Sequence, residues 1–110
     1  MKKIISELIK ETRIELNQKF NLNNDFTDMC YHSCELLSYK LKENGFKGMV
    51  VQGEVKPLWG KDLIIQHFWI ELENLIIDPT SEQMDFSEHI IERDDKNYIN
   101  YIFSNNYKDF

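Results

Sequence analysis

The spacing of apolar residues in this chain changes at Gly45, from the period of helices to the period of strands. Before Gly45, two segments carry apolar side chains every three or four residues, as helices with one buried face do. After Gly45, short β-branched and aromatic runs alternate with turns, which is typical of strands. Helices followed by strands predict an α+β fold, in which N-terminal helices pack on a small antiparallel sheet. The 110-residue length suits a single domain over residues 1–110.

Two helices are expected in the N-terminal part. The first covers residues 1 to about 20, and the second runs from about Asp28 to Asn44. Thr27 is the candidate N-cap of the second helix, because its hydroxyl can accept from a free backbone N–H. Gly45 is placed to end that helix in a left-handed conformation. The expected apolar positions are Ile5, Leu8, Ile9, Leu16 and Phe20 in the first helix and Cys30, Cys34, Leu37 and Leu41 in the second.

Three strands are expected next, over Met49–Val55, Asp62–Leu72 and Leu75–Asp78. Residues 56–61 contain a proline and a glycine and indicate a loop. The second strand has apolar residues on both faces, which predicts a central place in the sheet. Its return into the third strand is a tight turn at Glu73 and Asn74. From Phe86 onward, the sequence predicts short helices or a last strand that cover the sheet.

Charge and composition argue against several classes of function. The net charge is −6, whereas nucleic-acid binding calls for clustered Lys and Arg. The longest apolar runs are only a few residues, so no membrane-spanning segment is expected. Acidic residues interrupt the N-terminal apolar stretch, unlike the continuous apolar region of a signal peptide. Two cysteines do not make a secreted disulfide framework. We therefore expect a cytoplasmic protein with free thiols, and the sequence carries no signal for an oligomeric state.

Cys30, His67 and Asp78 form the candidate catalytic set, in the chain order of a thiol nucleophile, its base and the residue that orients the base. If Leu72 pairs with Leu75 across the turn, Asp78 lies on the same sheet face as His67, as its diagonal neighbour. Such neighbours have Cβ atoms roughly 7 Å apart, which lets a carboxylate reach an imidazole. A turn of three residues would reverse the facing and break the pair.

Two effects would activate the thiol of Cys30. The N-terminus of the second helix favours an anion in its first turn. An imidazolium of His67 would add to this if the helix packs its Cys30 stripe against the sheet face of His67. Asp78 would hold the imidazole tautomer and stabilise its charge, and backbone N–H groups near Cys30 would form part of an oxyanion hole. Taken singly, each residue is more simply a packing or turn residue, so the hypothesis depends on their conjunction.

Other polar and aromatic residues are expected to have structural roles. Cys34 lies one helical turn deeper than Cys30 and is expected in the core, and Trp69 is expected to pack beneath the site. His32 and His89 have polar neighbours and are expected at the surface. Trp59 would line a cleft or cap the core.

A zinc site is the sharpest competing hypothesis. Cys30, Cys34 and His67, with His32 or Asp78, could ligate zinc, because a C-x3-C pair on a helix puts both sulfurs on one side. Structural zinc sites, however, usually use C-x2-C pairs. We therefore expect no metal and no other cofactor.

These motifs resemble the papain-like and transglutaminase-like cysteine enzyme superfamily, in particular its small bacterial and phage members. There, the nucleophile opens a helix that continues with a small residue, leucines and a glycine. A strand, a His-x-Trp strand and an Asp-Pro-Thr end follow. The matching residues lie between about residues 23 and 84: Cys30, Cys34, Leu37, Leu41, Gly45, Val50 to Val55, His67, Phe68, Trp69, Asp78, Pro79, Thr80 and Gln83.

The resemblance implies a helix-against-sheet core and a Cys30, His67, Asp78 triad. It implies acyl transfer through a thioester, as peptide hydrolysis, glutamine deamidation or transglutamination of a protein or small amide substrate. The alternatives are a catalytically inactive interaction or immunity-type protein of the same fold and, third, a small zinc-binding module.

The sequence departs from the superfamily pattern at several positions. Cys34 stands where serine or alanine is common, and neither glycine nor tryptophan flanks Cys30. Papain-like enzymes have an upstream glutamine in the oxyanion hole, whereas here only Asn23 and Asn24 stand nearby. The short chain leaves little room for a second lobe, so action on one protein or a small amide is expected over broad proteolysis.

Overall fold

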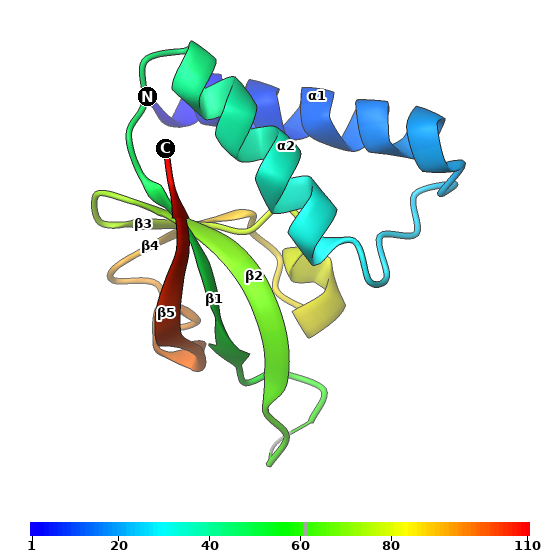
Figure 1. Ribbon diagram of the computed structural model, residues 1–110. Helices are drawn as coiled ribbons and strands as arrows, with labels where there is room; N and C mark the ends of the chain where they lie inside the picture. The colour runs from blue at the N-terminus through cyan, green and yellow to red at the C-terminus, as the bar shows by residue number, and fades with distance from the viewer. Residues whose placement is uncertain (61) are drawn as a thin grey trace.

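The computed structural model describes residues 1–60 and 62–110 of the chain. In chain order, the elements are α1 (Lys2–Phe20), α2 (Cys30–Glu43), β1 (Met49–Val55), β2 (Ile65–Leu72), β3 (Leu75–Ile77), the 3-10 helix η1 (Ser81–Met84), β4 (Ile90–Glu92), the 3-10 helix η2 (Tyr98–Asn100) and β5 (Tyr101–Asp109). The predicted α+β class is confirmed: two helices pack on a five-stranded antiparallel sheet (Figure 1). Among the described residues, no helix is long and apolar enough to cross a bilayer.

The two helices form where the apolar spacing predicts them, but the start of α2 differs. It begins at Cys30 with Met29 at the N-cap position, and no side chain caps it. The predicted cap is wrong, because the Thr27 hydroxyl donates to Asp25 Oδ1 at 2.6 Å within the preceding turn. Gly45 ends the helix with a φ of 86°, as predicted. Cys30 is therefore the first helical residue, where backbone N–H groups lack intrahelical partners.

The sheet has the strand order β4-β3-β2-β1-β5, which confirms the central place of β2. β2 begins at Ile65 rather than Asp62. The predicted hairpin register is also confirmed, since Leu72 pairs with Leu75 across the two-residue turn. Glu73 in that turn has a φ of 56°, as tight hairpin turns require. The predicted loop over 56–61 contains no helix or strand in its described part, and Lys61 lies outside the described residues.

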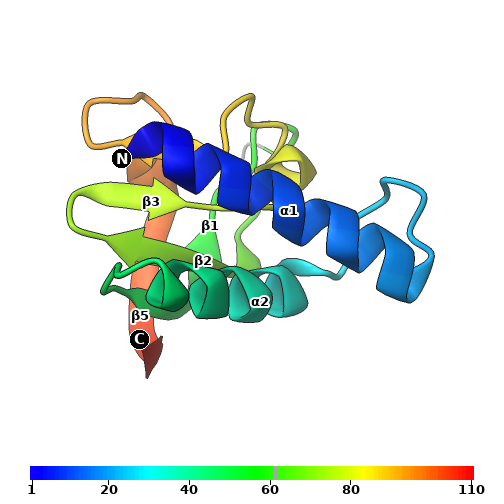
Figure 2. The ribbon, with the colours of Figure 1, turned by 90° about the horizontal axis from the view of Figure 1, so that it is seen from above.

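Both helices lie on one face of the sheet and cross it side by side (Figure 1 and Figure 2). The predicted stripe of α2 packs there against β1, β2 and β3. Phe20 at the end of α1, which was expected among the apolar contacts of that helix, is instead 42% exposed. The other sheet face carries a second core around Trp69, closed by η1 and the C-terminal segment. The buried members are Ile5, Leu8, Ile9, Cys34, Leu37, Leu41, Val50, Ile70, Leu72, Leu75 and Ile77 on the helix face, and Val51, Val55, Trp69, Ile76, Met84, Phe86, Ile91 and Tyr101 on the other.

The C-terminal segment extends the sheet at both edges, and several of its side chains pack on the face that carries Trp69. β4 pairs with β3, and β5 pairs with β1 along its whole length. Of the two predicted alternatives, the last strand is therefore correct, with one short 3-10 helix before it. Two irregularities in the β1–β5 register leave Ser104 and Tyr107 as extra residues on β5. Such bulges re-aim side chains, and Tyr107 here contacts the rings of Tyr31 and Phe68.

Gly53 is expected to be intolerant of any side chain. It lies opposite His67 in the β1–β2 pair, and the Trp69 ring and the Ile102 carbonyl oxygen of β5 occupy the space that a Cβ would take. Gly53→Ala would force the ring or β5 to move, and overpacking of this kind costs about 1–3 kcal/mol. We expect chemical denaturation to report a lower free energy of unfolding by this amount.

Gly60→Ala is the matched control. Its new methyl would meet only the side chain of Leu63, which is exposed and can turn away. Equal losses of stability in the two variants would contradict the close approach of β5 and Trp69 to Gly53.

Candidate active site

His67 and Asp78 form a buried pair on the sheet face that carries Trp69. His67 Nε2 donates to Asp78 Oδ2 at 2.8 Å, and both side chains are almost fully buried. The pair follows from the hairpin register: Ile70 is opposite Ile77, so the next diagonal position brings Asp78 to His67. The sequence prediction that these two residues share one face and meet is therefore correct.

Cys30 reaches this pair at the point where β3 leaves β2. Peptide groups alternate in direction along a strand, so that of Phe68 points toward the side of β3. The register would place the Pro79 carbonyl opposite Phe68 as its acceptor, but β3 has already ended at Ile77 and that carbonyl accepts from Arg13 Nη1 at 2.6 Å. The N–H of Phe68 donates instead to Cys30, which also hydrogen-bonds to the His67 side chain.

The approach of Cys30 differs from the sequence prediction. The α2 stripe packs against Val50, Ile70 and Leu72, on the opposite sheet face from Trp69 and therefore from His67. The sequence left open whether this stripe packs against the face of His67, and the structure shows that it does not. Cys30 reaches the imidazole because it is the first residue of α2 and because the edge of β2 is open beside it. Since Nε2 of His67 is bound to Asp78, Nδ1 is the ring nitrogen that remains for the thiol.

The electrostatics of the site favour a thiolate and an imidazolium. Burial raises the pKa of Cys30, but the hydrogen bond and charge of His67 and the N–H of Phe68 outweigh it, so the pKa is lowered below its usual value. Burial likewise opposes the charged form of His67, but Asp78 and Cys30 raise its pKa from 6.5 to about 10. The pKa of Cys34, by contrast, is raised well above its usual value, chiefly by complete burial.

Asp78 is held by four hydrogen bonds from three residues. Its Oδ2 accepts from His67 and, at 2.7 Å, from the Tyr101 hydroxyl. Its Oδ1 accepts from the backbone N–H of Thr80 at 3.1 Å and from the Thr80 hydroxyl at 3.4 Å. Burial opposes the charged form, but His67, Tyr101 and Thr80 lower the pKa of Asp78 below its usual value. Asp78 is therefore ionised although it is completely buried.

His89 supports Asp78 from the backbone side and is not the surface residue that the sequence suggests. The backbone N–H of Asp78 donates to the carbonyl of His89 at 2.8 Å. Nδ1 of His89 lies 3.0 Å from the Asp78 carbonyl oxygen and 2.9 Å from Ser81 Oγ. Because Ser81 Oγ already donates to Glu88, Nδ1 carries the proton that bonds the Asp78 carbonyl. His89 therefore fixes the peptide from which the carboxylate projects.

Two of the supporting residues, Tyr101 and His89, were not expected at the site. Tyr101 lies 23 positions after Asp78 and belongs to an edge strand that pairs with β1. No local motif connects either residue with Asp78. The signal in the sequence is indirect: a buried carboxylate needs several donors, and the aromatic-rich C-terminal segment can supply one.

The remaining predicted positions have mixed outcomes. Cys34 and Trp69 are fully buried, as predicted, and His32 is exposed. Trp59 is 55% exposed, and its Nε1 donates to the carbonyl of Gln83 at 2.7 Å. The side chain of Gln83 donates in turn to the carbonyl of Phe26, which ties together the segments that flank Cys30 and Asp78.

The asparagines do not contribute to the site. Asn24 exchanges two hydrogen bonds of 2.8 Å with the side chain of Asn17 on α1, and Asn23 lies in the same exposed, asparagine-rich region. Neither position therefore matches the oxyanion-hole glutamine of papain-like enzymes.

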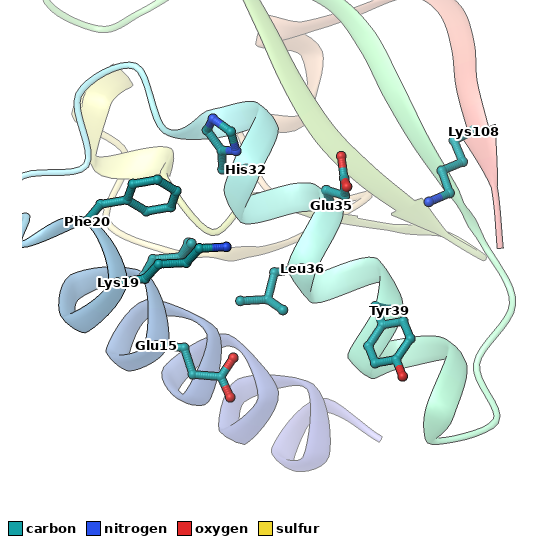
Figure 3. Close-up of a pocket in the computed structure, with 9 residues that line it drawn as sticks. Glu15, Lys19, Phe20, His32, Glu35, Leu36, Tyr39 and Lys108 are labelled. Atoms are coloured by element: carbon teal, nitrogen blue, oxygen red, sulfur yellow. The ribbon is translucent and has the colours of Figure 1, made fainter.

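The groove in Figure 3 lies away from the triad. It has a volume of about 390 Å³ and is lined from α1, α2 and β5. The α2 residues in it, including His32 and Tyr39, lie on the helix face opposite the buried stripe of Cys34 and Leu37. His32 stacks there on Phe20, with ring centroids 5.3 Å apart. The geometry that unites Cys30, His67 and Asp78 is therefore independent of this groove.

A shared metal site has no support from side-chain placement. Within residues 1–60 and 62–110, no group of three or more His, Cys, Asp and Glu side chains is arranged to hold an ion. His32, one of the two alternatives for the fourth ligand, lies against Phe20 instead.

No protein-family model matches this chain, and no curated protein or solved structure is significantly similar to it. The function therefore has to be argued from the site itself.

The pH dependence of stability tests the His67–Asp78 pair. A histidine with a raised pKa contributes its full stabilisation below its unfolded value of 6.5 and loses it as the pH rises through about 10. His67→Gln would leave Asp78 buried without a positive partner, at a cost of about 3 kcal/mol or more near pH 6. We expect the stability gap between the two proteins to narrow steadily between pH 6.5 and 10.

His32→Gln is the control for this titration, because His32 is exposed and lies outside the pair. Unfolding free energies from denaturant titrations at several pH values give the comparison. A gap for His67→Gln that stays constant with pH would mean that His67 is neutral in the folded protein.

Proposed function

We propose that this protein is a cysteine-dependent acyl-transfer enzyme that uses Cys30 as nucleophile, His67 as general acid and base, and Asp78 as the residue that orients His67. The supporting observation is the hydrogen-bonded series from the half-buried Cys30 at the open edge of β2, through His67, to the buried Asp78. The packing of two helices on an antiparallel sheet supports the fold family that we propose, that of papain-like and transglutaminase-like enzymes.

The geometry suits a two-step reaction through a thioester. The Cys30 thiolate attacks the carbonyl carbon of an amide, and the imidazolium of His67 protonates the leaving nitrogen. In the second step, neutral His67 accepts a proton from the incoming water or amine, which attacks the thioester and releases the Cys30 thiolate, so that the thiolate–imidazolium pair is restored. Asp78 stabilises the imidazolium each time that it forms, because its carboxylate is held ionised.

The first turn of α2 supplies donors for the developing oxyanion. No side chain caps this helix, so the backbone N–H of Cys30 remains free to bind a negatively charged oxygen next to the thiol. This donor replaces the side-chain amide that the sequence lacks. A capping hydroxyl would compete for the same N–H groups. The absence of a side-chain cap on α2 therefore leaves these groups available to the oxyanion.

The substrate class that we propose is an amide of a protein or a small molecule, with hydrolysis, deamidation and transfer as the possible outcomes. All three share the thioester and differ only in the acceptor and the leaving group. The aromatic rings of Tyr31 and Phe68, which follow Cys30 and His67 in sequence, lie edge to face with a centroid distance of 5.2 Å.

Differential labelling of the two thiols tests the proposal. Cys30 has a lowered pKa, whereas burial raises that of Cys34. We expect iodoacetamide at neutral pH to alkylate Cys30 on the order of 100-fold faster than Cys34, because only the thiolate reacts. Peptide mass spectrometry over time gives both rates in one sample.

His67→Ala should abolish the difference between the thiols, and His32→Ala should preserve it. Slow and equal labelling of Cys30 and Cys34 in the wild-type protein would refute the enzyme proposal. Fast labelling that survives His67→Ala would show that the thiol is activated without its base.

A non-catalytic interaction protein of the same fold is the second candidate. The observation that favours it is a group of exposed apolar side chains near the β1–β2 connection: Leu58, Trp59, Leu63 and Ile64. Exposed apolar patches often mark binding surfaces, and the net charge of −6 would favour a basic partner. Binding that survives Cys30→Ala, together with an unreactive thiol, would support this candidate over the enzyme.

A further inference from the structure

Tyr101 is a buried residue that contacts the triad but has no part in the proposed reaction. Its hydroxyl donates to Asp78 Oδ2 at 2.7 Å, the same oxygen that accepts from His67. Its ring packs between Trp69 and Phe86, with centroid distances of 5.1 and 5.6 Å. The side chain is therefore fixed by two rings, and its hydroxyl is fixed by the carboxylate.

Two donors on one carboxylate oxygen compete for the same negative charge. A hydrogen bond from Tyr101 draws electron density toward its own proton and leaves less for the bond from His67. The Thr80 donors bind the other oxygen, so they orient the carboxylate without sharing the lone pairs of Oδ2. Tyr101 thus differs from Thr80 in acting on the atom that His67 contacts.

We propose that Tyr101 is a positioning residue that limits how strongly Asp78 stabilises the imidazolium form of His67. This inference rests on the proposed function in one respect only, namely that the imidazolium gives up its Nδ1 proton during catalysis. Without Tyr101, the carboxylate would bind the imidazolium more strongly, and His67 would release its proton less readily to a leaving group. With Tyr101, the same carboxylate stays ionised and yet allows the transfer.

The position of Tyr101 on β5 makes this tuning depend on the C-terminal strand. β5 pairs with β1 and has no backbone contact with the strands that carry His67 and Asp78. Its first residue nevertheless reaches through the second core to the triad. Pairing of β5 at the sheet edge therefore completes the environment of Asp78.

The test is a titration of the His67 imidazole by NMR in Tyr101→Phe, with Cys30→Ala in the background. Other titratable groups near the pair are Cys30 and Cys34 from α2 and, beside Tyr101, Asp95. The Cys30→Ala background removes the strongest of these neighbours and makes the readout independent of any reaction. Tyr98→Phe is the matched control, because Tyr98 packs against the same core cluster and has no hydrogen bond to Asp78.

We expect Tyr101→Phe to raise the pKa of His67 by about one unit, the size of effect that one hydrogen bond to a charged group supplies, and Tyr98→Phe to leave it unchanged. A pKa of His67 that stays the same or falls in Tyr101→Phe would overturn the inference, since Tyr101 would then be only a packing residue or an anchor for Asp78. An inert Cys30 in the labelling experiment would refute the proposed function and leave this titration fully interpretable.

Discussion

The buried pair of His67 and Asp78 is the interaction on which the rest of the structure depends. A carboxylate that is completely removed from water destabilises the fold by several kcal/mol unless cations and hydrogen-bond donors surround it. Here, His67, Tyr101 and Thr80 supply those donors from β2, β5 and the segment after β3. These donors reach Asp78 because of three features of the sheet: its strand order, the end of β3 at Ile77 and the pairing of β5 with β1.

The early end of β3 also explains how a helix on one sheet face can reach a pair on the other. β3 ends at Ile77 and the Pro79 carbonyl bonds Arg13, so the edge of β2 is open there and the N–H of Phe68 is left for Cys30. Cys30, as the first residue of an uncapped helix, occupies that opening. The thiolate form of Cys30 is therefore stabilised by three features: the cationic ring of His67, the backbone N–H of Phe68 and the first turn of α2.

Much of this arrangement could be predicted from the sequence, because it depends on interactions between residues that are close along the chain. Helical spacing predicted both helices and the buried stripe, and the two-residue turn at Glu73 and Asn74 predicted the pairing of Leu72 with Leu75 and thus the meeting of His67 with Asp78. The predicted Thr27 cap was wrong because α2 begins at Cys30, which places Met29 at the N-cap position. Tyr101 was missed because the pairing of β5 with β1 brings together residues far apart in sequence, and no local pattern encodes such contacts.

The central claim is that Cys30 ionises more readily than an ordinary thiol, because His67 carries a positive charge beside it that Asp78 stabilises. The most direct measurement is the ultraviolet absorbance of the thiolate as a function of pH in Cys34→Ser, which leaves Cys30 as the only thiol. The account predicts a transition for Cys30 below the ordinary thiol value of 9.0, and a return toward that value in the same protein with His67→Ala. A transition at or above 9.0 in the protein that retains His67 would contradict it.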